Sequence, residues 1–317
     1  MNFKLKYGCF ILCVLVHSLT GMSSSFQSLP SASNVAYSRK VIPVFCTIKN
    51  FKSLYEKNDK SVIALFLKFY FEKISEFIIN NGGHINKYVG ETVFAVFDIS
   101  SCSLLFSNLA EEVLNPFKFI FSFLDEIDNS FKDIVNLELC VGMEVGEVMN
   151  GVVGYQHFYE NAFIGDVVNT ASRLKDLCFV KNENIIISAT LLRYLPRYVS
   201  RMFKDLGPIE LKGKSKVVFS YGYKHDQSEF VCSRDIINER NLNKKIPISY
   251  HEATQKIFYE KYIILCCDIR NFTTFCESYN NCPLLVFDFL KNYFYSLISI
   301  SLNSGGIIYK LLGDEII

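Results

Sequence analysis

The spacing of apolar and polar residues changes along the chain, and it predicts strands in some segments and helices in others. The stretch "VIPVFCTIKNFKSL" (41–54) begins with an apolar run of strand type and continues into a turn. Apolar residues at helical spacing over 62–81 then predict an amphipathic helix. Next, "HINKYVGETVFAVF" (84–97) predicts a hairpin whose tight turn is Gly90-Glu91. Together these segments predict a β-α-β-β order.

The pattern continues to about residue 223 and indicates the fold class. A helical stretch (103–128) leads to a glycine-punctuated strand (137–154), a short strand near 162–164 and a helix from Asp166. A strand in "ENIIISAT" and a final hairpin, "FKDLGPIELKGKSKVVFSYGY", follow. Alternating strands and helices on one mixed sheet predict an α/β sandwich.

The first elements of this pattern recur more than 200 residues later. "YIILCCDIRNFTTF" (262–275) matches the first strand at an offset of 221 residues, and "GGIIYKLLGDE" (305–315) matches "GGHINKYVGE" (82–91) at an offset of 223. A helical stretch (284–303) lies between them, as in the first copy. The second copy holds its first strand, its helix and half a hairpin, so we expect that it cannot close its own sheet and that the natural protein is longer or this chain a degenerate piece of one.

These matches divide the chain into a leader with linker (1–35), a complete domain (40–225), a linker (226–260) and a partial second domain (261–317). In the leader, two early lysines precede an apolar run from 8 to 19, the layout of a secretory signal, a short anchor or an apolar leader with no export role. This run is short for a membrane span, which leaves membrane association open.

Charge and cysteine content narrow the classes of ligand. The chain has 33 basic and 32 acidic residues, which removes the usual electrostatic reason to expect nucleic-acid binding. Its 11 cysteines are scattered and form no C-x-x-C pair, so we interpret them as reduced thiols in a cytosolic setting, without a disulfide framework or a zinc site. Any ligand must therefore be argued from a local site.

Two carboxylates of the second copy are expected to converge. Asp268 ends the apolar run "IILCCD", and Asp314 is at the tip of the hairpin that the β-α-β order places beside that run. Two such carboxylates suit one or two Mg²⁺ ions, with water and substrate phosphates as further ligands. The first copy has Thr47 and Glu91 at these positions, so we expect it to have lost the metal pair. The alternative is that all are turn residues of two hairpins.

A second group of polar side chains lies in "FIGDVVNTASRL" (163–174). Asp166 can cap a helix on which Asn169 and Arg173, at i and i+4, share one face. An amide and a guanidinium placed in this way can hold a ribose and stabilise charge on a phosphoryl group, although the same pattern describes a solvated helix face. The preceding "VGMEVGEVMNGVVG" favours the first interpretation, because its four glycines indicate backbone held close to another group.

Five segments resemble the ordered motif series of class III nucleotidyl cyclase catalytic domains, here as a tandem pair: "CDIRNFTTF", "GGIIYKLLGDE", "VGMEVGEVMNGVVG", "FIGDVVNTASRL" and "IELKGKSKVVFSYGY". The resemblance covers 41–223 as one domain and 261–317 as a truncated second copy, and it implies the ferredoxin-like βαββαβ palm fold. "GGIIYKLLGDE" alone would equally suggest a diguanylate cyclase of the related palm fold. The glycine-rich strand and "VNTASR" decide against that family.

The resemblance implies a head-to-tail pair of domains, within one chain or between chains, with the active site at their interface. It implies that Asp268, Ile269 and Asp314 hold two Mg²⁺ or Mn²⁺ ions, while Asn169 and Arg173 come from the other domain. The reaction it implies is attack of a ribose 3′-hydroxyl on the α-phosphorus of a nucleoside triphosphate, with loss of pyrophosphate.

The resemblance also implies candidate substrate-binding residues. Lys212, Lys214 and Lys310 are candidates for the phosphates, although a basic hairpin tip is also typical of a solvated surface. Lys87 is at the base-selecting position, where a cationic donor suits N1 of adenine, and Ala162 is at its usual partner's position without a side chain able to form a hydrogen bond. ATP is therefore the favoured substrate, and a guanylyl cyclase or a non-catalytic regulatory or dimerisation module are the alternatives. A catalytic portion that uses ATP is expected on the cytosolic side.

Overall fold

The computed structural model describes residues 36–99, 106–131, 137–155, 158–210, 217–225, 263–279, 282–312 and 314–317. The predicted leader, the predicted linker and two candidate phosphate ligands, Lys212 and Lys214, lie outside these ranges. Among the described residues, no helix combines the length and the apolar character needed to cross a bilayer.

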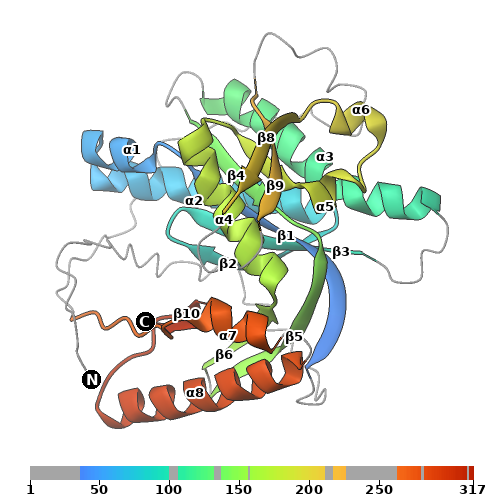
Figure 1. Cartoon of the computed structure of the whole chain (residues 1–317). Coiled ribbons are helices and arrows are strands. Elements are labelled where there is room, and N and C mark those ends of the chain that lie inside the picture. Colours follow the sequence, from blue (N-terminus) through green and yellow to red (C-terminus); the bar gives the residue numbers. More distant parts are fainter. Residues whose placement is uncertain are drawn as a thin grey trace.

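One large mixed sheet forms the centre of the first domain (Figure 1). Within the described ranges its order is β2-β3-β1-β4-β7-β9-β8, and β5 and β6 extend from β1 as an arm. Its strands are β1 (Tyr37–Ile48), β2 (Gly83–Val89), β3 (Thr92–Asp98), β4 (Leu139–Met143), β5 (Gly146–Tyr155), β6 (Phe158–Ile164), β7 (Ile185–Ser188), β8 (Lys204–Ile209) and β9 (Val218–Tyr223).

Helices cover both faces of this sheet. Those of the first domain are α1 (Phe51–Lys57), α2 (Lys60–Asn80), α3 (Phe106–Phe131), α4 (Asp166–Lys181), α5 (Ala189–Leu192) and α6 (Arg197–Ser200). α2 and α3 pack on one face and form the main core with it, while α4 packs on the other face. β4 is buried along its whole length because it lies between these layers, which explains its continuous apolar sequence. The predicted α/β fold is confirmed.

The predicted strand over 137–154 is instead two strands, β4 and β5. The C-terminal half of β1 pairs with β4 and its N-terminal half pairs with β5, so the chain changes direction between them. The link is held by the buried Glu144, whose carboxylate accepts hydrogen bonds from the Val145 N–H (2.9 Å) and the Ser188 hydroxyl (2.5 Å). The glycine-punctuated pattern did not locate this break, because the contact between Glu144 and Ser188 that holds it joins segments 44 residues apart.

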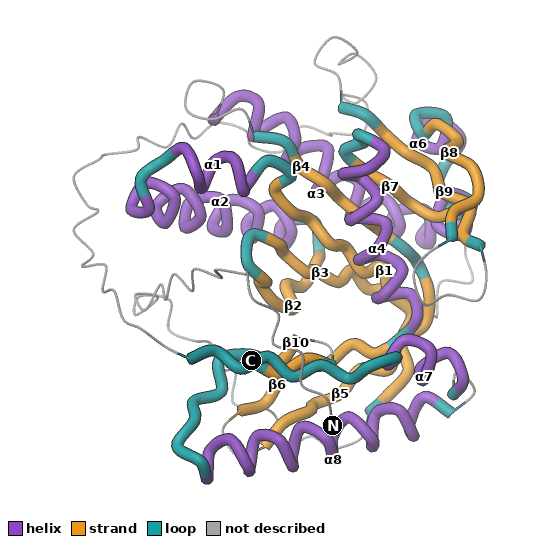
Figure 2. Tube along the Cα trace, turned by 60° about the vertical axis from the view of Figure 1, so that its left-hand side comes forward, coloured by secondary structure: helices purple, strands orange, loops and turns teal. Residues whose placement is uncertain are grey.

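The C-terminal segment packs against the arm formed by β5 and β6. It contains α7 (Phe272–Ser278), α8 (Pro283–Asn303) and the short hairpin of β10 (Leu311–Leu312) and β11 (Glu315–Ile316). Figures 1 and 2 both place α8 along the arm, away from the main core. Met149 and Val153 of β5 share an apolar cluster with residues of α8, among them Phe287 and Phe294.

The strand predicted at the start of the second copy is not formed in the described residues. Residues 263–266 have no ladder, and only Cys267 forms a bridge, with Ile316. Ile263 is fully exposed, so the apolar run has no sheet to enter. An apolar run forms a strand only where neighbouring strands accept and donate its backbone hydrogen bonds. Beside this segment lies only a hairpin whose two strands have two residues each, which is too short to pair with it.

Candidate active site

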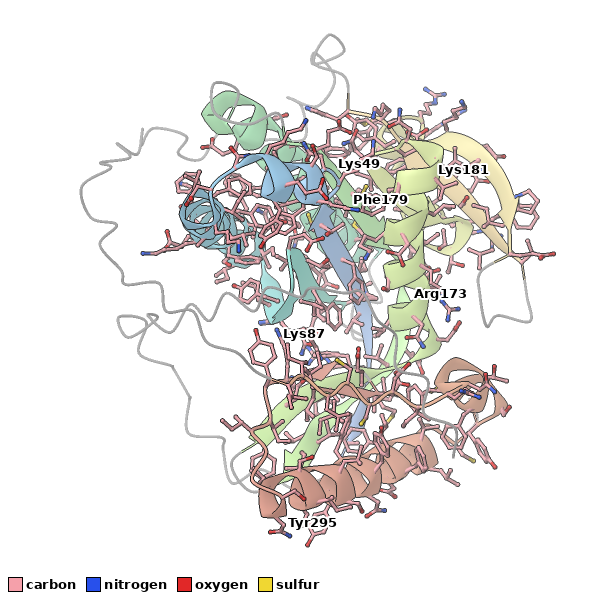
Figure 3. The ribbon with its side chains drawn as sticks, turned by 90° about the vertical axis from the view of Figure 1, so that its left-hand side faces the viewer. Lys49, Lys87, Arg173, Phe179, Lys181 and Tyr295 are labelled. Atoms are coloured by element: carbon pink, nitrogen blue, oxygen red, sulfur yellow. The ribbon has the colours of Figure 1, made fainter. Side chains whose placement is uncertain are left out.

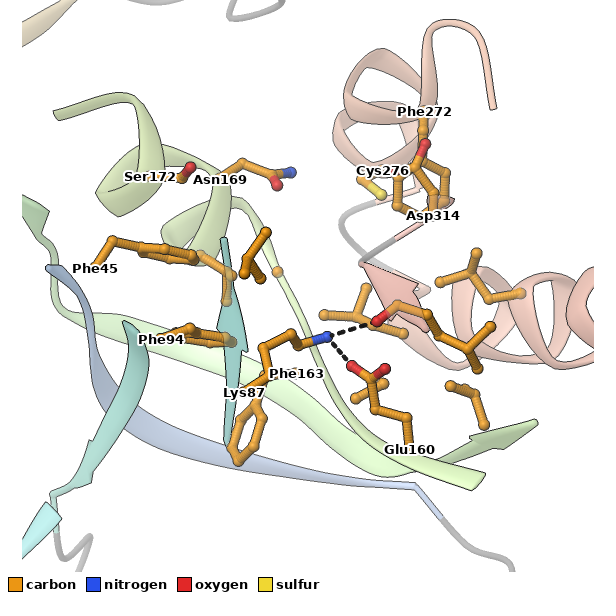
Figure 4. Close-up of a pocket in the computed structure, with 18 residues that line it drawn as sticks. Phe45, Lys87, Phe94, Glu160, Phe163, Asn169, Ser172, Phe272, Cys276 and Asp314 are labelled. Atoms are coloured by element: carbon orange, nitrogen blue, oxygen red, sulfur yellow. Dashed lines mark hydrogen bonds and ion pairs between the residues drawn. The ribbon is translucent and has the colours of Figure 1, made fainter. Parts of the chain in front are cut away.

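A pocket of about 240 Å³ lies where the first domain meets the C-terminal segment (Figure 4). Strands β1, β2, β3, β5 and β6 and helix α4 line it from the first domain, and α7, α8 and β10 line it from the other side. Most of its lining is apolar, and its polar side chains are those of Lys87, Glu160, Asn169, Ser172 and Asp314. The pocket therefore joins the two parts of the chain that the sequence predicted to act together.

Helix α4 presents Asn169 to the pocket because it packs unusually close to the sheet. A Cβ atom on Gly142 of β4 would lie 2.1 Å from the Ala171 carbonyl oxygen, so only glycine permits this approach. Asn169 and Ser172, three residues apart on α4, both line the pocket. Arg173 is not among the lining residues; Figure 3 shows it midway along α4, half-buried.

Lys87 reaches the pocket from β2, where the strand pairing is irregular. The register with β3 shifts between Ile85 and Lys87, a bulge that redirects the side chains that follow. The intervening Asn86 donates a hydrogen bond to the Asn161 carbonyl oxygen (2.8 Å), which links this irregular part of strand β2 to β6. The Lys87 ammonium forms an ion pair with Glu160.

The same ammonium also contacts the C-terminal segment. Lys87 Nζ donates to the Leu311 carbonyl oxygen at 3.4 Å, a contact across the two parts of the chain. Burial, and after it the charge of Lys310, lowers the pKa of Lys87 to about 7. Lys310 holds the position in the second copy that Lys87 holds in the first, and burial lowers its pKa as well. Lys310 lies near Lys87 but does not line the pocket.

Asp268 and Asp314 converge as the sequence predicted. Cys267 and Ile316 exchange two backbone hydrogen bonds of 2.9 and 2.8 Å, which bring the residues next to them together. The carboxyl groups of Asp268 and Asp314 share a hydrogen bond. Burial, that hydrogen bond and the charge of Asp268 raise the pKa of Asp314 to about 7, while backbone N–H groups, including that of Ile269, act in the opposite direction.

These two carboxyl groups fit a divalent cation. Two like charges this close repel each other, and a bound cation would relieve the repulsion and favour both ionised forms. In the described part of the chain, no three His, Cys, Asp or Glu side chains gather at one point. Water and substrate oxygens would have to complete the coordination, which is the usual arrangement for Mg²⁺.

The equivalent positions of the first copy have a different environment. Thr47 is buried in β1, and its hydroxyl oxygen accepts a hydrogen bond from the Thr92 hydroxyl (2.9 Å). Its partner position is Glu91, at the turn between β2 and β3. A hydroxyl already bonded within the sheet is a poor metal ligand, in agreement with the expected loss of the metal pair.

Sequence reasoning missed several residues of the pocket. Phe45 and Phe94, whose rings stack at 4.4 Å, form part of its apolar wall together with Phe163. Glu160 was also missed, although a signal was present. It is two residues before Ala162, and alternate residues of a strand share one face. Both side chains line the pocket.

A family model for the adenylate and guanylate cyclase catalytic domain matches residues 35–222, more than half of the chain. The chain belongs to this family. The match confirms the resemblance drawn from the sequence motifs and assigns the first domain as a cyclase catalytic domain. It ends before the C-terminal segment, so the second copy remains a prediction from the sequence.

Curated relatives of this cyclase domain include two adenylate cyclases. It is 29% identical over 195 residues to an adenylate cyclase of Anabaena cylindrica, covering 60% of this chain and 38% of the relative. It is 26% identical over 187 residues to the terminal-differentiation-specific adenylate cyclase of Dictyostelium discoideum, covering 59% of this chain and 9% of the relative. The chain thus spans less than two thirds of either protein.

Solved structures share the cyclase fold. The adenylyl cyclase CyaB from P. aeruginosa aligns with a TM-score of 0.51 and 22% identity, covering 61% of this chain and 97% of that chain. A bacterial light-regulated adenylyl cyclase aligns with a TM-score of 0.51 and 18% identity, covering 64% of this chain and 57% of that chain. At these identities the likeness establishes the fold.

Proposed function

We propose that this chain is an adenylyl cyclase, which converts ATP into 3′,5′-cyclic AMP and pyrophosphate in the pocket between the first domain and the C-terminal segment. One observation carries the proposal: Asn169 and Asp314, from opposite sides, line the same pocket. A composite site of this kind needs both parts of the chain, or one part from each of two chains. The curated relatives named above are adenylate cyclases, which supports ATP as the substrate.

In the proposed reaction, the C-terminal segment binds the metal ions. Asp268 and Asp314, with the backbone of Ile269 beside them, would hold Mg²⁺ or Mn²⁺. Two such ions would lower the pKa of the ribose 3′-hydroxyl and neutralise the triphosphate. This segment also carries Lys310, which we assign to the phosphates together with Lys212 or Lys214.

The first domain positions the nucleotide. Asn169 would hold the ribose by its amide, so that the 3′-hydroxyl lies in line with the bond to pyrophosphate. Arg173, one turn further along α4, would stabilise the charge that develops on the transferred phosphoryl group, for which its side chain has to turn toward the pocket. Lys87 would donate to N1 of adenine, because its ammonium is the cationic donor among the described residues that line the pocket.

The test is turnover of ATP and GTP in parallel by the purified full chain, with Mn²⁺ or Mg²⁺. We expect cyclic AMP as the main product, and loss of roughly 10²–10³-fold in kcat for Asn169→Ala and Arg173→Ala. Arg201→Ala, an exposed arginine outside the pocket, is the control and should leave kcat unchanged.

The same experiment separates the alternatives. Cyclic GMP as the main product would indicate a guanylyl cyclase, which Ala162 leaves open because it offers the base no hydrogen bond. Absence of both products, also after addition of a complete second cyclase domain, would contradict catalysis and favour a regulatory or dimerisation module.

A further inference from the structure

Arg39 lies where strand β1 extends beyond the main sheet into the arm formed by β5 and β6 (Figure 1). The ladder between β1 and β3 begins at Val41, and Arg39 precedes it, paired with Val148 of β5. The guanidinium of Arg39 forms an ion pair with Asp98, the last residue of β3, and donates a hydrogen bond to the side-chain oxygen of Asn150 on β5 (3.1 Å). One side chain therefore connects the main sheet to the arm.

Asn150 extends this connection to the second strand of the arm. Its amide nitrogen donates to the Asn161 side-chain oxygen (2.5 Å) and to the Ala162 carbonyl oxygen (3.2 Å), both on β6. The Arg39 guanidinium also lies over the ring of Phe163, the next residue of β6, 5.6 Å from its centroid. Asn150 is 2% exposed, so its amide is buried and has partners for both its oxygen and its nitrogen.

A buried network of this kind specifies an arrangement more than it adds stability. The net contribution of a hydrogen bond to the free energy of unfolding is small, because the same groups bind water in the unfolded chain. Replacement of both partners by apolar groups of similar shape can be nearly neutral. A fully satisfied network is directional, however, and favours one orientation of the strands that it joins. Its loss should therefore alter the geometry of the arm more than the stability of the fold.

The orientation of the arm decides where the proposed metal ligands lie. Alternate residues of β5 face opposite sides, so Met149 and Val153 pack on α8 while Asn150 faces the network. The C-terminal segment, which carries Asp314, is thus attached to the arm. Asn169 belongs to α4, which packs on the main sheet. A change in the angle between the arm and the main sheet would therefore change the separation of Asn169 and Asp314 across the pocket.

We infer that Arg39 and Asn150 are positioning residues of the cyclase, which fix the arm relative to the main sheet and so set the separation of Asp314 and Asn169. The inference rests on the proposed function, since a site composed of both parts needs this alignment. Neither residue lines the pocket, so both act on the reaction through residues that do. A displacement of about 1 Å in such a site can lower a rate by roughly 10²-fold.

The experiment combines kinetics with a distance measurement on the full chain. Arg39→Met and Asn150→Leu remove the network and put apolar side chains of similar size in its place. Each should lower kcat for ATP by about 10–10²-fold, while KM for ATP changes by less than about threefold and Tm by less than about 3 °C. The double variant should be no slower than the slower single variant, because the two side chains act as a unit.

The distance measurement reports the position of the arm independently of activity. Nitroxide labels carried on p-acetylphenylalanine replace Tyr159 of β6 and Tyr198 of α6, both exposed, so the cysteines stay unlabelled. Double electron–electron resonance should give one narrow distance distribution in the otherwise wild-type chain and a shifted or broader one in Arg39→Met and Asn150→Leu. Arg193→Met, an exposed arginine outside the network, is the control and should change neither the distribution nor kcat.

Arg39→Lys keeps the charge and should recover part of the rate, since an ammonium lacks the planar fork that reaches both Asp98 and Asn150. An unchanged distance distribution in Arg39→Met would overturn the inference, as would a changed distribution with an unaltered kcat. A fall in kcat that only follows a loss of folded protein at the assay temperature would overturn it as well. A wild type that forms no cyclic nucleotide would contradict the proposed function, and the distance distributions would then still decide whether the two residues fix the arm.

Discussion

The two copies of the repeated segment differ at the positions where the proposed metal ions would bind. In the first copy Thr47 is buried in the middle of a complete sheet and is hydrogen-bonded to Thr92. In the second copy Asp268 is exposed and shares a hydrogen bond with Asp314 beside the pocket. A pair of carboxylates would be strongly disfavoured inside the sheet of the first copy, because buried charges need partners. This difference supports the proposal that the predicted second copy, and not the first, binds the metal ions.

The two copies also differ in what stabilises them. The first domain has its own core between the sheet and helices α2 and α3. The apolar residues of the C-terminal segment are buried largely against the arm, where Phe287 and Phe294 of α8 meet Met149 and Val153 of β5. The position of the proposed metal ligands thus depends on packing against the other copy.

The largest expected effect is the loss of activity when the acid of the second copy is neutralised. Asp314→Asn should lower the rate of cyclic AMP formation by roughly 10²–10³-fold, since it removes one ligand of the proposed metal ions. Glu91→Gln changes the equivalent position of the first copy and should leave the rate within about twofold. Equal effects of the two substitutions would contradict this proposal.

A smaller effect is expected from blocking the contact between the copies. A Cβ on Gly151 of β5 would lie 2.5 Å from Phe287 Cζ, so Gly151→Val should displace α8. We expect activity to fall about tenfold, with faster proteolysis between residues 263 and 317. Adding Phe287→Ala makes room for the valine and should recover part of the activity, a coupling that a double-mutant cycle measures. No recovery would indicate that the contact does not position the metal ligands.

The smallest expected effect is on stability and depends on pH. The pKa of Asp314 is raised from 3.8 to about 7, so between these pH values the folded chain keeps a proton that the unfolded chain loses, and stability falls as pH rises. Without metal, Asp314→Asn should therefore raise Tm at pH 8, by about 2–4 °C after allowance for solvent screening, and change it little at pH 4.

The matched variant Glu91→Gln should show no such pH-dependent difference. Saturating Mn²⁺ at pH 8 should stabilise the wild type but not Asp314→Asn, because a cation that binds the folded state alone raises its stability by mass action. A higher Tm of Asp314→Asn at both pH values would argue against repulsion between the two acids as the cause.

Much of the fold followed from the sequence because local patterns determine it. Periodicity predicted β1, α2 and the hairpin of β2 and β3, whereas the expectation that Asn169 and Asp314 share a site came from the resemblance to class III cyclases. The break at Glu144 was missed, since the contact with Ser188 that holds it comes from a distant segment that the local sequence does not reveal. The strand after residue 262 was predicted wrongly, because strand formation needs partners that the local sequence does not reveal.

The meeting of Lys87 and Glu160 could not be derived from spacing. It depends on the irregular register at Asn86 and on the pairing of β5 with β6, both of which are set by contacts between distant segments. Helical spacing predicted that Arg173 shares a face with Asn169, but only Asn169 lines the pocket.

The two halves of strand β1 pair with different parts of the first domain, one with the main sheet and one with the arm. Residues 37–41 pair with β5 and residues 44–48 pair with β4, and Pro43 lies at the junction, where a missing N–H is tolerated. On its other edge β1 pairs with β3 continuously from Val41 to Cys46, across Pro43, so the main sheet and the arm share one unbroken strand. Because α8 packs on β5 and β5 pairs with β1, the distance between the proposed metal ligands and Asn169 is set in part by the shape of this one strand.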